Sequence, residues 1–412
     1  MLPIFRALRH RNYKLFFIGQ GVSLVGWWIQ QLALNWLMYR MTGSALLLGL
    51  VSFASNIPVL LLAPVAGIVS DRFDLHRLMV LIQALEMLQA VALTVLAFGG
   101  WIAPWHIIAL AAFMGVCVAF ELPVRHAFMP QMVAAREDIP NAVALTSFIS
   151  NGGRLIGPSI AGVVITLASE AVCFLINTLT YIVVLWTFVS MRVAPTARER
   201  HAAGGWQRFK EGAAYAWNFV PIRLLLAALA VMSFMAMPYN TLMPVIVREV
   251  YHGGADVLGY LVGSAGFGAF LGTGYLAWRS QVRGLVRMLA YTMAAAGAAL
   301  VLFSLSRAAL LSAPLLLVVG FGILATTVSV NMIMQSIVDD DKRGRVMSFY
   351  TMAFLGVSPL GALCAGALAE WIGASHVILI GGACCIATAL VLARAQATLA
   401  RPITDKLDTA GA

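Results

Sequence analysis

The sequence is poor in charge: only 11% of its 412 residues are Asp, Glu, Lys or Arg, whereas 61% are hydrophobic. A soluble globular domain carries about 25% charged residues, so this composition excludes that class. The length instead allows twelve crossings of a bilayer, each of about 20 apolar residues, joined by short loops. We therefore predict an all-α polytopic membrane protein.

Several kinds of chemical motif are also missing. The five cysteines fall in apolar runs without C-x-x-C or Cys/His spacing, which argues against disulfides and a structural metal. No nucleophile triad or clustered catalytic set is present, so we do not expect an enzyme such as a lipid acyltransferase. The chain also lacks a G-x-x-x-x-G-K-S/T run, which argues against ATP as the direct energy source. No cofactor is expected.

The formal charge of +10 comes from basic residues in the loops, so nucleic acid is not an expected partner. Of the 27 Lys and Arg residues, Arg40, Arg248 and Arg307 lie on one side and Arg154 lies within a span. All the others lie on the side that both termini share. The positive-inside rule then places both termini in the cytoplasm. The first apolar run is too long for a cleaved signal and is expected to remain as a helix.

Apolar runs predict the membrane helices. Their approximate ranges are 13–39, 44–70, 78–99, 104–128, 142–168, 171–191, 222–248, 257–279, 285–306, 312–337, 346–370 and 375–396. The one long polar connection, 192–221, divides them six and six. This predicts an N-terminal bundle (1–191), a C-terminal bundle (222–396) and a cytoplasmic tail (397–412). Aromatic and basic residues in 192–221 indicate an amphipathic surface helix or a plain linker.

An internal repeat relates the two halves at a fixed offset of 201 residues. The matched pairs are Asp138/Asp339, Ser147/Ser348, Phe148/Phe349, Pro158/Pro359 and Ala161/Ala362. Two parallel six-helix halves are typical of transporters, in which the substrate path runs between the halves near the bilayer midplane.

Ionisable residues within a span are the sharpest functional signal in such a sequence, and Glu86, Glu121 and Arg154 are the candidates. A charge at the bilayer centre costs about 2.5–3.5 kcal/mol or more, so each needs a polar partner. We expect Arg154 to pair with Glu121 or Glu86, and one carboxylate to carry an exchanged proton. A static structural ion pair is the alternative.

Arg154 lies in a stretch that also contains Gly153, Gly157, Pro158 and Gly162. Small residues permit close helix approach, and proline weakens the backbone ladder. We expect this part of the fifth helix to act as a hinge. The repeat keeps the proline but places Leu355 opposite Arg154, so bending should be shared by both halves and the buried charge should not.

Residues 67–77, with the sequence G-I-V-S-D-R-F-D-L-H-R, resemble the loop signature G-x-x-x-D-R-x-G-R-R/K of the major facilitator superfamily. Asp74 stands where glycine is usual. The glycine and proline run of the fifth helix resembles that superfamily's antiporter signature. Short motifs at 11–13, 19–20, 36–37, 42–44 and 343–346 resemble the exporter branch that includes enterobactin and macrolide efflux proteins. The resemblance covers the whole chain but specifies no substrate.

The resemblance implies twelve helices in two pseudo-symmetric bundles, located in the inner membrane of a bacterium. It also implies a cytoplasmic latch formed by Gly67, Asp71, Arg72 and Arg77, in which the glycine lets a neighbouring helix come close. Solvated topology charges are the alternative. The second half has Trp278 at the position of the latch aspartate, so its latch is degenerate.

In this superfamily helices 1, 4, 7 and 10 line the substrate cavity, and polar residues on three of them are candidates. They are Gln20, Trp27, Gln31, Asn35, Tyr239, Asn240, Thr327, Asn331 and Gln335. Amides and aromatics around an apolar cavity suit partly hydrophobic solutes. Hydrogen bonding between helices is the alternative role for any one of them.

The resulting expectation is a monomeric secondary exporter that works by alternating access. It would move a small amphipathic organic solute, such as a drug, out of the cell in exchange for protons. Export of a siderophore or another secondary metabolite is the first alternative, and a membrane sensor or scaffold without transport is the second.

Overall fold

The computed structural model describes residues 3–193, 215, 217–279, 284–338 and 340–399, and in this part of the chain the regular structure is helical. The first half contains η1 (Pro3–Arg9), α1 (Arg11–Thr42), α2 (Ala45–Arg72), α3 (Leu75–Phe98), α4 (Pro104–Met132), η2 (Arg136–Asp138), α5 (Ile139–Leu167) and α6 (Glu170–Val189). The second half contains α8 (Val220–Val231), η3 (Met232–Ala236), α9 (Tyr239–Glu249), α10 (Ala255–Trp278), α11 (Leu285–Leu305), α12 (Ala309–Ile337), α13 (Asp340–Thr351), η4 (Met352–Gly356), α14 (Ser358–Ile372) and α15 (Ala374–Arg394).

Eleven helical segments of the described residues are long and apolar enough to cross a membrane. The 32-residue α1 is also long enough, at about 48 Å, but its amide side chains make it less hydrophobic. With α1 the count is consistent with the twelve predicted spans, and the all-α membrane fold is confirmed. Most of the expected amphipathic helix in 192–221 lies outside the described residues, as does the tail from residue 400.

Two predicted helices are interrupted where the sequence suggested continuous spans. The run 222–248 is divided by η3 and the run 346–370 by η4, and both interruptions are π-helical turns. A proline follows each turn, Pro238 after η3 and Pro359 after η4. Because proline has no N–H to donate, each of these prolines removes one bond from the regular helical ladder. The π turns accommodate this loss.

Helix ends explain two of the sequence motifs. Gly43 follows α1 with φ of 64° and donates its N–H to the Tyr39 carbonyl, a left-handed ending that favours glycine. Ser44 then caps α2 by accepting from the Leu47 N–H at 3.2 Å. Asp74, which departs from the superfamily pattern, caps α3 by accepting from the Arg77 N–H at 2.8 Å. The departure therefore has a local structural reason.

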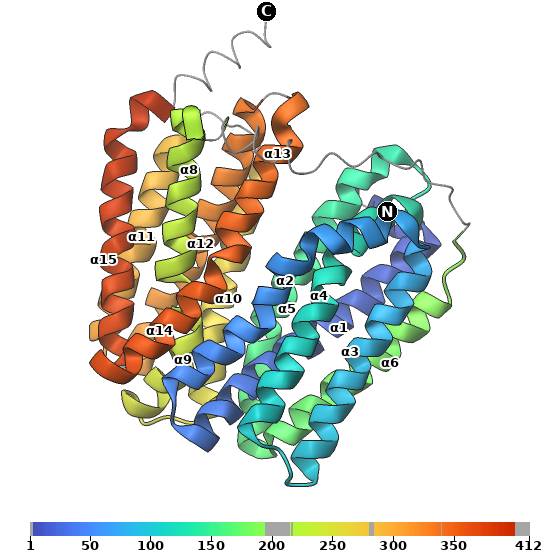
Figure 1. Cartoon of the computed structure of the whole chain (residues 1–412), viewed down its shortest axis with the longest axis horizontal. Coiled ribbons are helices and arrows are strands. Elements are labelled where there is room, and N and C mark those ends of the chain that lie inside the picture. The colour runs from blue at the N-terminus through green and yellow to red at the C-terminus, as the bar shows by residue number, and fades with distance from the viewer. Residues whose placement is uncertain (1–2, 194–214, 216, 280–283, 339, 400–412) are drawn as a thin grey trace, which may run out of the picture. The chain divides into compact units, whose positions relative to one another are not determined.

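The chain forms two compact units. Unit 1 contains residues 1–200 and 247–263, and thus α1 to α6 together with the end of α9 and the start of α10. Within it α1 packs against α5 and α6, α2 against α4, and α3 against α4 and α6 (Figure 1). Its buried core is apolar, with aromatic side chains such as Phe16, Phe128 and Phe188 in contact.

Unit 2 contains residues 201–246 and 264–412. Its helix α11 packs against α12 and α15, and α14 also packs on α15. The two π-helical turns touch, because the Ser233 hydroxyl of η3 donates to the Phe354 carbonyl of η4. Glycines allow other helices to pack closely on η3. A Cβ at Gly361 would meet the Phe234 carbonyl, and one at Gly381 would meet the Met235 carbonyl.

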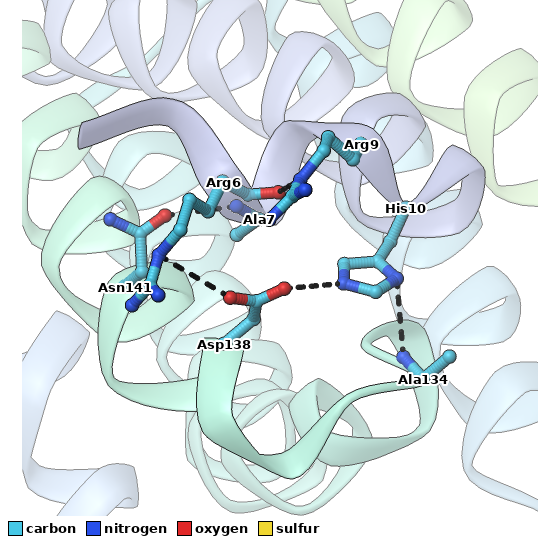
Figure 2. Close-up of polar contacts among 7 residues, drawn as sticks. All are labelled: Arg6, Ala7, Arg9, His10, Ala134, Asp138 and Asn141. Carbon is cyan, nitrogen blue, oxygen red and sulfur yellow. Dashed lines mark hydrogen bonds and ion pairs between the residues drawn. The ribbon is translucent and has the colours of Figure 1, made fainter. Parts of the chain in front are cut away.

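The N-terminal segment is anchored to the start of α5 (Figure 2). The Ala7 N–H donates to Asn141 Oδ1 at 2.9 Å, and Arg6 lies 3.6 Å from the buried carboxylate of Asp138. His10 Nδ1 accepts from the Ala134 N–H, so its Nε2 carries the proton and donates to Asp138 Oδ2 at 3.0 Å. The basic N-terminus is thus part of the fold of unit 1.

The motif Arg11-Asn12-Tyr13 extends this anchoring. Arg11 donates to the Ser190 carbonyl, and Asn12 makes two reciprocal bonds with the backbone of Arg192. The buried Tyr13 hydroxyl donates to the Ala142 carbonyl at 2.7 Å. This motif therefore ties the start of α1 to the end of α6 and to α5.

Candidate functional site

Unit 1 contains a cavity of about 160 Å³ between α1, α3, α4 and α6. Its polar lining is unusual for the interior of a membrane helix bundle, because it contains two carboxyl groups, two amides and a guanidinium. The lining residues are Gln20, Ser23, Leu24, Trp27, Gln83, Glu86, Val118, Glu121, Leu122, Arg125 and Tyr181. This volume has room for several waters.

Helical periodicity explains why these residues meet. On α1, Gln20, Ser23 and Trp27 are spaced by three and four residues, which places them on one face. Gln83 and Glu86 on α3 are three apart, and Glu121 and Arg125 on α4 are four apart. Each helix thus directs one short polar stripe into the cavity.

Glu121 has a cationic partner. Its Oε1 accepts from Arg125 Nη1 at 3.0 Å and from Gln20 Nε2 at 3.0 Å. Both side chains of the ion pair are largely buried, with 14% of Arg125 and 12% of Glu121 exposed. Charge-assisted hydrogen bonds of this kind are stronger than neutral ones, and they compensate for burial of the carboxylate.

Glu86 has a different environment. Its Oε2 accepts from Gln83 Nε2 at 2.9 Å, and Tyr181 lies beside it in the cavity lining. Glu86 is 3% exposed and Gln83 is 1% exposed. Among the described residues, neither Glu86 Oε1 nor Gln83 Oε1 has a hydrogen-bond partner. The two carboxyl groups of the cavity are therefore not equivalent.

Arg154 does not take the place that the sequence suggested. Its guanidinium lies over the ring of Trp28, 5.2 Å from the centroid, while the ion-pair partner of Glu121 is Arg125. Sequence reasoning selected the arginine near the middle of a span and gave less weight to Arg125, although an i,i+4 pair on one helix is a readable signal.

The helix 5 glycines make close helix contacts. A Cβ at Gly157 would lie 2.4 Å from Trp28 Cβ, and one at Gly153 would lie 3.3 Å from Leu24. Gly162 faces the start of α10, where a Cβ would meet the Ala255 carbonyl at 2.7 Å. α5 runs through Pro158 as a single helix. The expected hinge at Pro158 remains a prediction, and close packing is the role that the geometry supports.

The latch residues lie at the α2–α3 connection. Asp71, Arg72 and Arg77 are exposed, and in the described structure nothing lies within 4 Å of a Cβ built at Gly67. The expected close approach of a helix at Gly67 remains a prediction. In this connection Asp74 caps α3 by accepting from the Arg77 N–H.

The remaining candidates separate into two groups. In unit 1, Gln20 and Trp27 line the cavity, whereas Gln31 and Asn35 are half-buried on the same α1 face further along the helix. In unit 2, Tyr239 and Asn240 lie at the start of α9 and Thr327, Asn331 and Gln335 on α12. Their substrate role remains a prediction.

Contacts on α12 are internal to unit 2. Gln335 Nε2 donates to Asn331 Oδ1 at 2.5 Å, and the Thr327 hydroxyl donates to the Ile323 carbonyl at 2.8 Å. Tyr350 donates to the Thr327 carbonyl at 3.3 Å. Hydrogen bonding within and between helices therefore accounts for part of this set.

A second polar group in unit 1 was missed by sequence reasoning. Asn177 Nδ2 donates to Gln30 Oε1, Gln30 Nε2 donates to Gln89 Oε1, and Gln89 Nε2 donates to the Leu110 carbonyl. All three amides are buried. Amide residues within predicted spans are the signal that could have indicated this network, because membrane interiors require such groups to be paired.

Comparison with known proteins agrees with this architecture. The family model described as transmembrane secretion effector matches residues 3–409. The chain belongs to the transmembrane secretion effector family. The expected exporter branch of the major facilitator superfamily is thereby confirmed, and with it a chain that is a membrane transporter and not an enzyme.

Among curated members, the staphyloferrin A transporter of Staphylococcus aureus is 27% identical over 379 residues, covering 92% of this chain and 94% of its own. The macrolide efflux protein A of Streptococcus pyogenes is 22% identical over 395 residues, with 93% and 96% coverage. Among solved structures, the nucleoside transporter NupG matches with a TM-score of 0.72 at 12% identity, covering 93% of this chain and 98% of that one. At this identity the last match supports the fold alone.

Proposed function

We propose that this chain exports a small amphipathic organic solute across the bacterial cytoplasmic membrane by alternating access, in exchange for protons. Its membership of an exporter family supports the transport of small organic solutes. The proton coupling rests on the cavity of unit 1, where Glu86 and Glu121 are buried together. A carboxyl group that exchanges protons must alternate between a protonated and an ionised state, and a hydrated cavity provides access to it.

Two substrate classes follow from the relatives. The macrolide efflux protein and the multidrug efflux pump Tap of Mycobacterium bovis favour a drug or another xenobiotic. The staphyloferrin A transporter favours a siderophore, and this relative matches 92% of the chain. The cavity of unit 1 does not decide between the two classes, because its volume of about 160 Å³ is below the roughly 300–1,000 Å³ of sites for drug-sized ligands.

The test is a transport assay with purified protein in proteoliposomes under an imposed pH gradient. A macrolide, a siderophore and a lipophilic cation are compared, and a protonophore collapses the gradient as the control. We expect gradient-dependent flux of at least one solute, and loss of that dependence in a Glu86→Gln, Glu121→Gln double variant. Flux that ignores the gradient, or no flux with any of the three, contradicts the proposal.

A further inference from the structure

Two acceptor atoms of the cavity are left without a donor, and they belong to neighbouring groups. Gln83 Nε2 donates to Glu86 Oε2, while Gln83 Oε1 and Glu86 Oε1 have no hydrogen-bond partner among the described residues. Both side chains are almost fully buried. An unpaired buried acceptor is costly, so each of the two oxygens needs a donor.

One hydrogen atom on Glu86 can supply a donor to this pair, as can the Tyr181 hydroxyl beside Glu86 or a water in the cavity. A primary amide and a carboxylic acid can form a cyclic pair, in which the amide N–H donates to the acid carbonyl and the acid O–H donates to the amide carbonyl. The first of these two bonds is present at 2.9 Å. A proton on Glu86 Oε1 would supply the donor that the second bond needs. An ionised carboxylate accepts only and cannot supply it.

The cation of the cavity is engaged elsewhere. Arg125 donates to Glu121 Oε1, and Gln20 donates to the same oxygen. Glu86 has an amide donor but no ion-pair partner among the described residues. An ionised carboxylate that is buried without a cation is far less favourable than the neutral acid. The charge of the carboxyl pair is therefore carried by Glu121.

We propose that Glu86 is the carboxyl group that carries the exchanged proton, that Gln83 is the positioning residue that holds it as an acid, and that Glu121 stays ionised against Arg125. That this proton is exchanged during transport rests on the proposed function, whereas the two protonation states rest on the hydrogen bonds alone. Release of the proton leaves two bare acceptors facing the cavity. A solute with N–H or O–H donors, or cavity water, takes over their hydrogen bonding.

Infrared difference spectroscopy of the purified protein tests the assignment without transport. Wild-type protein at neutral pH should show the carbonyl band of a buried carboxylic acid. Glu86→Gln should lose this band, because glutamine has no carboxyl group. The variant should still fold, because a glutamine can pair with Gln83 in the same way. Glu121→Gln is the matched control and should retain the band. A band that survives in Glu86→Gln and disappears in Glu121→Gln overturns the proposal.

The positioning role of Gln83 has its own readout. In Gln83→Leu the acid carbonyl loses the amide N–H that donates to it. Its band should therefore shift to higher wavenumber, because a hydrogen bond to a carbonyl oxygen weakens the C=O bond. Gln20→Leu, which removes the amide donor of Glu121, should leave the band in place. An unshifted band in Gln83→Leu contradicts the positioning role, even if Glu86→Gln cannot be purified.

The two proposals can fail separately. Protein that keeps the Glu86 acid band but shows no gradient-dependent flux contradicts proton-coupled export and leaves the protonation states intact. Protein that transports with the gradient but has its band at Glu121 contradicts the assignment and leaves the function intact.

Discussion

Buried amide side chains in unit 1 form a directional chain of donors from Asn177 through Gln30 to Gln89. Gln30 both accepts and donates within it, and it is 3% exposed. Neighbouring Gln31 is half-buried, on the α1 face that continues the cavity stripe. Adjacent glutamines on one helix therefore serve different purposes, because successive helical residues point about 100° apart.

Gln30→Leu should lower the thermal stability of the protein. It leaves Gln89 Oε1 and Asn177 Nδ2 unpaired in the core, at a cost of about 2 kcal/mol. Gln31→Leu is the matched control and should change the unfolding temperature little. The measurement is thermal unfolding in detergent, and equal unfolding temperatures for the two variants would show that the amide chain adds no stability.

Asp138 is the buried carboxylate that receives the N-terminal segment, through Arg6 and His10 (Figure 2). Asp138→Asn removes the charge attraction for Arg6 while keeping an acceptor for His10. We expect trypsin to cleave after the arginines of residues 6–11 several-fold faster in this variant. The exposed neighbour gives the control, Glu137→Gln, which should be cleaved at the wild-type rate. Equal rates for both variants would argue against this anchor.

At the scale of elements, the glycines of α5 differ sharply in their surroundings. Gly157 is in tight contact with α1, whereas a Cβ at Gly152 meets nothing within 4 Å. Both lie inside the same helix, so alanine raises helix propensity equally at the two positions, by about 1 kcal/mol. The difference between the two substitutions isolates the helix contact.

Gly157→Ala should destabilise the protein, because the added Cβ forces α1 and α5 apart at a cost of about 1–3 kcal/mol that exceeds the propensity gain. Gly152→Ala should be neutral or stabilising. Thermal unfolding of both variants measures the difference. If Gly157→Ala matched Gly152→Ala, the space beside Trp28 would have to be adjustable, and the hinge would become the better explanation for this glycine.

At the scale of the molecule, the two units differ in what they bury. The buried polar side chains of unit 1 include the carboxyl groups of Glu86 and Glu121 and several amides, whereas those of unit 2 in the described residues are hydroxyls of Ser and Thr. Hydroxyls can donate to the carbonyl one turn earlier in their own helix, and so need no polar partner across a bundle. The repeat of sequence therefore does not extend to the buried charge.

Membrane topology is a prediction for the whole chain. In a variant without native cysteines, Trp101→Cys should react with a membrane-impermeant maleimide on intact cells, because the α3–α4 connection is expected outside. Phe73→Cys, in the α2–α3 connection, should react only after the membrane is permeabilised. Both side chains are exposed, with 69% and 61% of their surface accessible. The reverse pattern would invert the proposed orientation.

Much of the fold was predictable because each membrane crossing is marked by a continuous apolar run in the sequence. Apolar runs predicted the helices to within a few residues of their observed ends, for instance 285–306 against Leu285–Leu305. The breaks at η3 and η4 were not predicted, although Pro238 and Pro359 mark them. A proline in a span predicts a disturbed ladder but not its form, since α5 passes through Pro158 without a break.

The sequence by itself determined the class of protein, its family and the presence of two carboxyl groups among its spans, because hydropathy and short motifs are local properties of the chain. Tertiary structure decided the partners. Which arginine reaches Glu121, which amide reaches Glu86 and which oxygens stay unpaired depend on how α1, α3, α4 and α6 rotate against one another. Hydrogen bonds act over about 3 Å, so a small rotation of a helix changes the partner while its hydropathy stays the same.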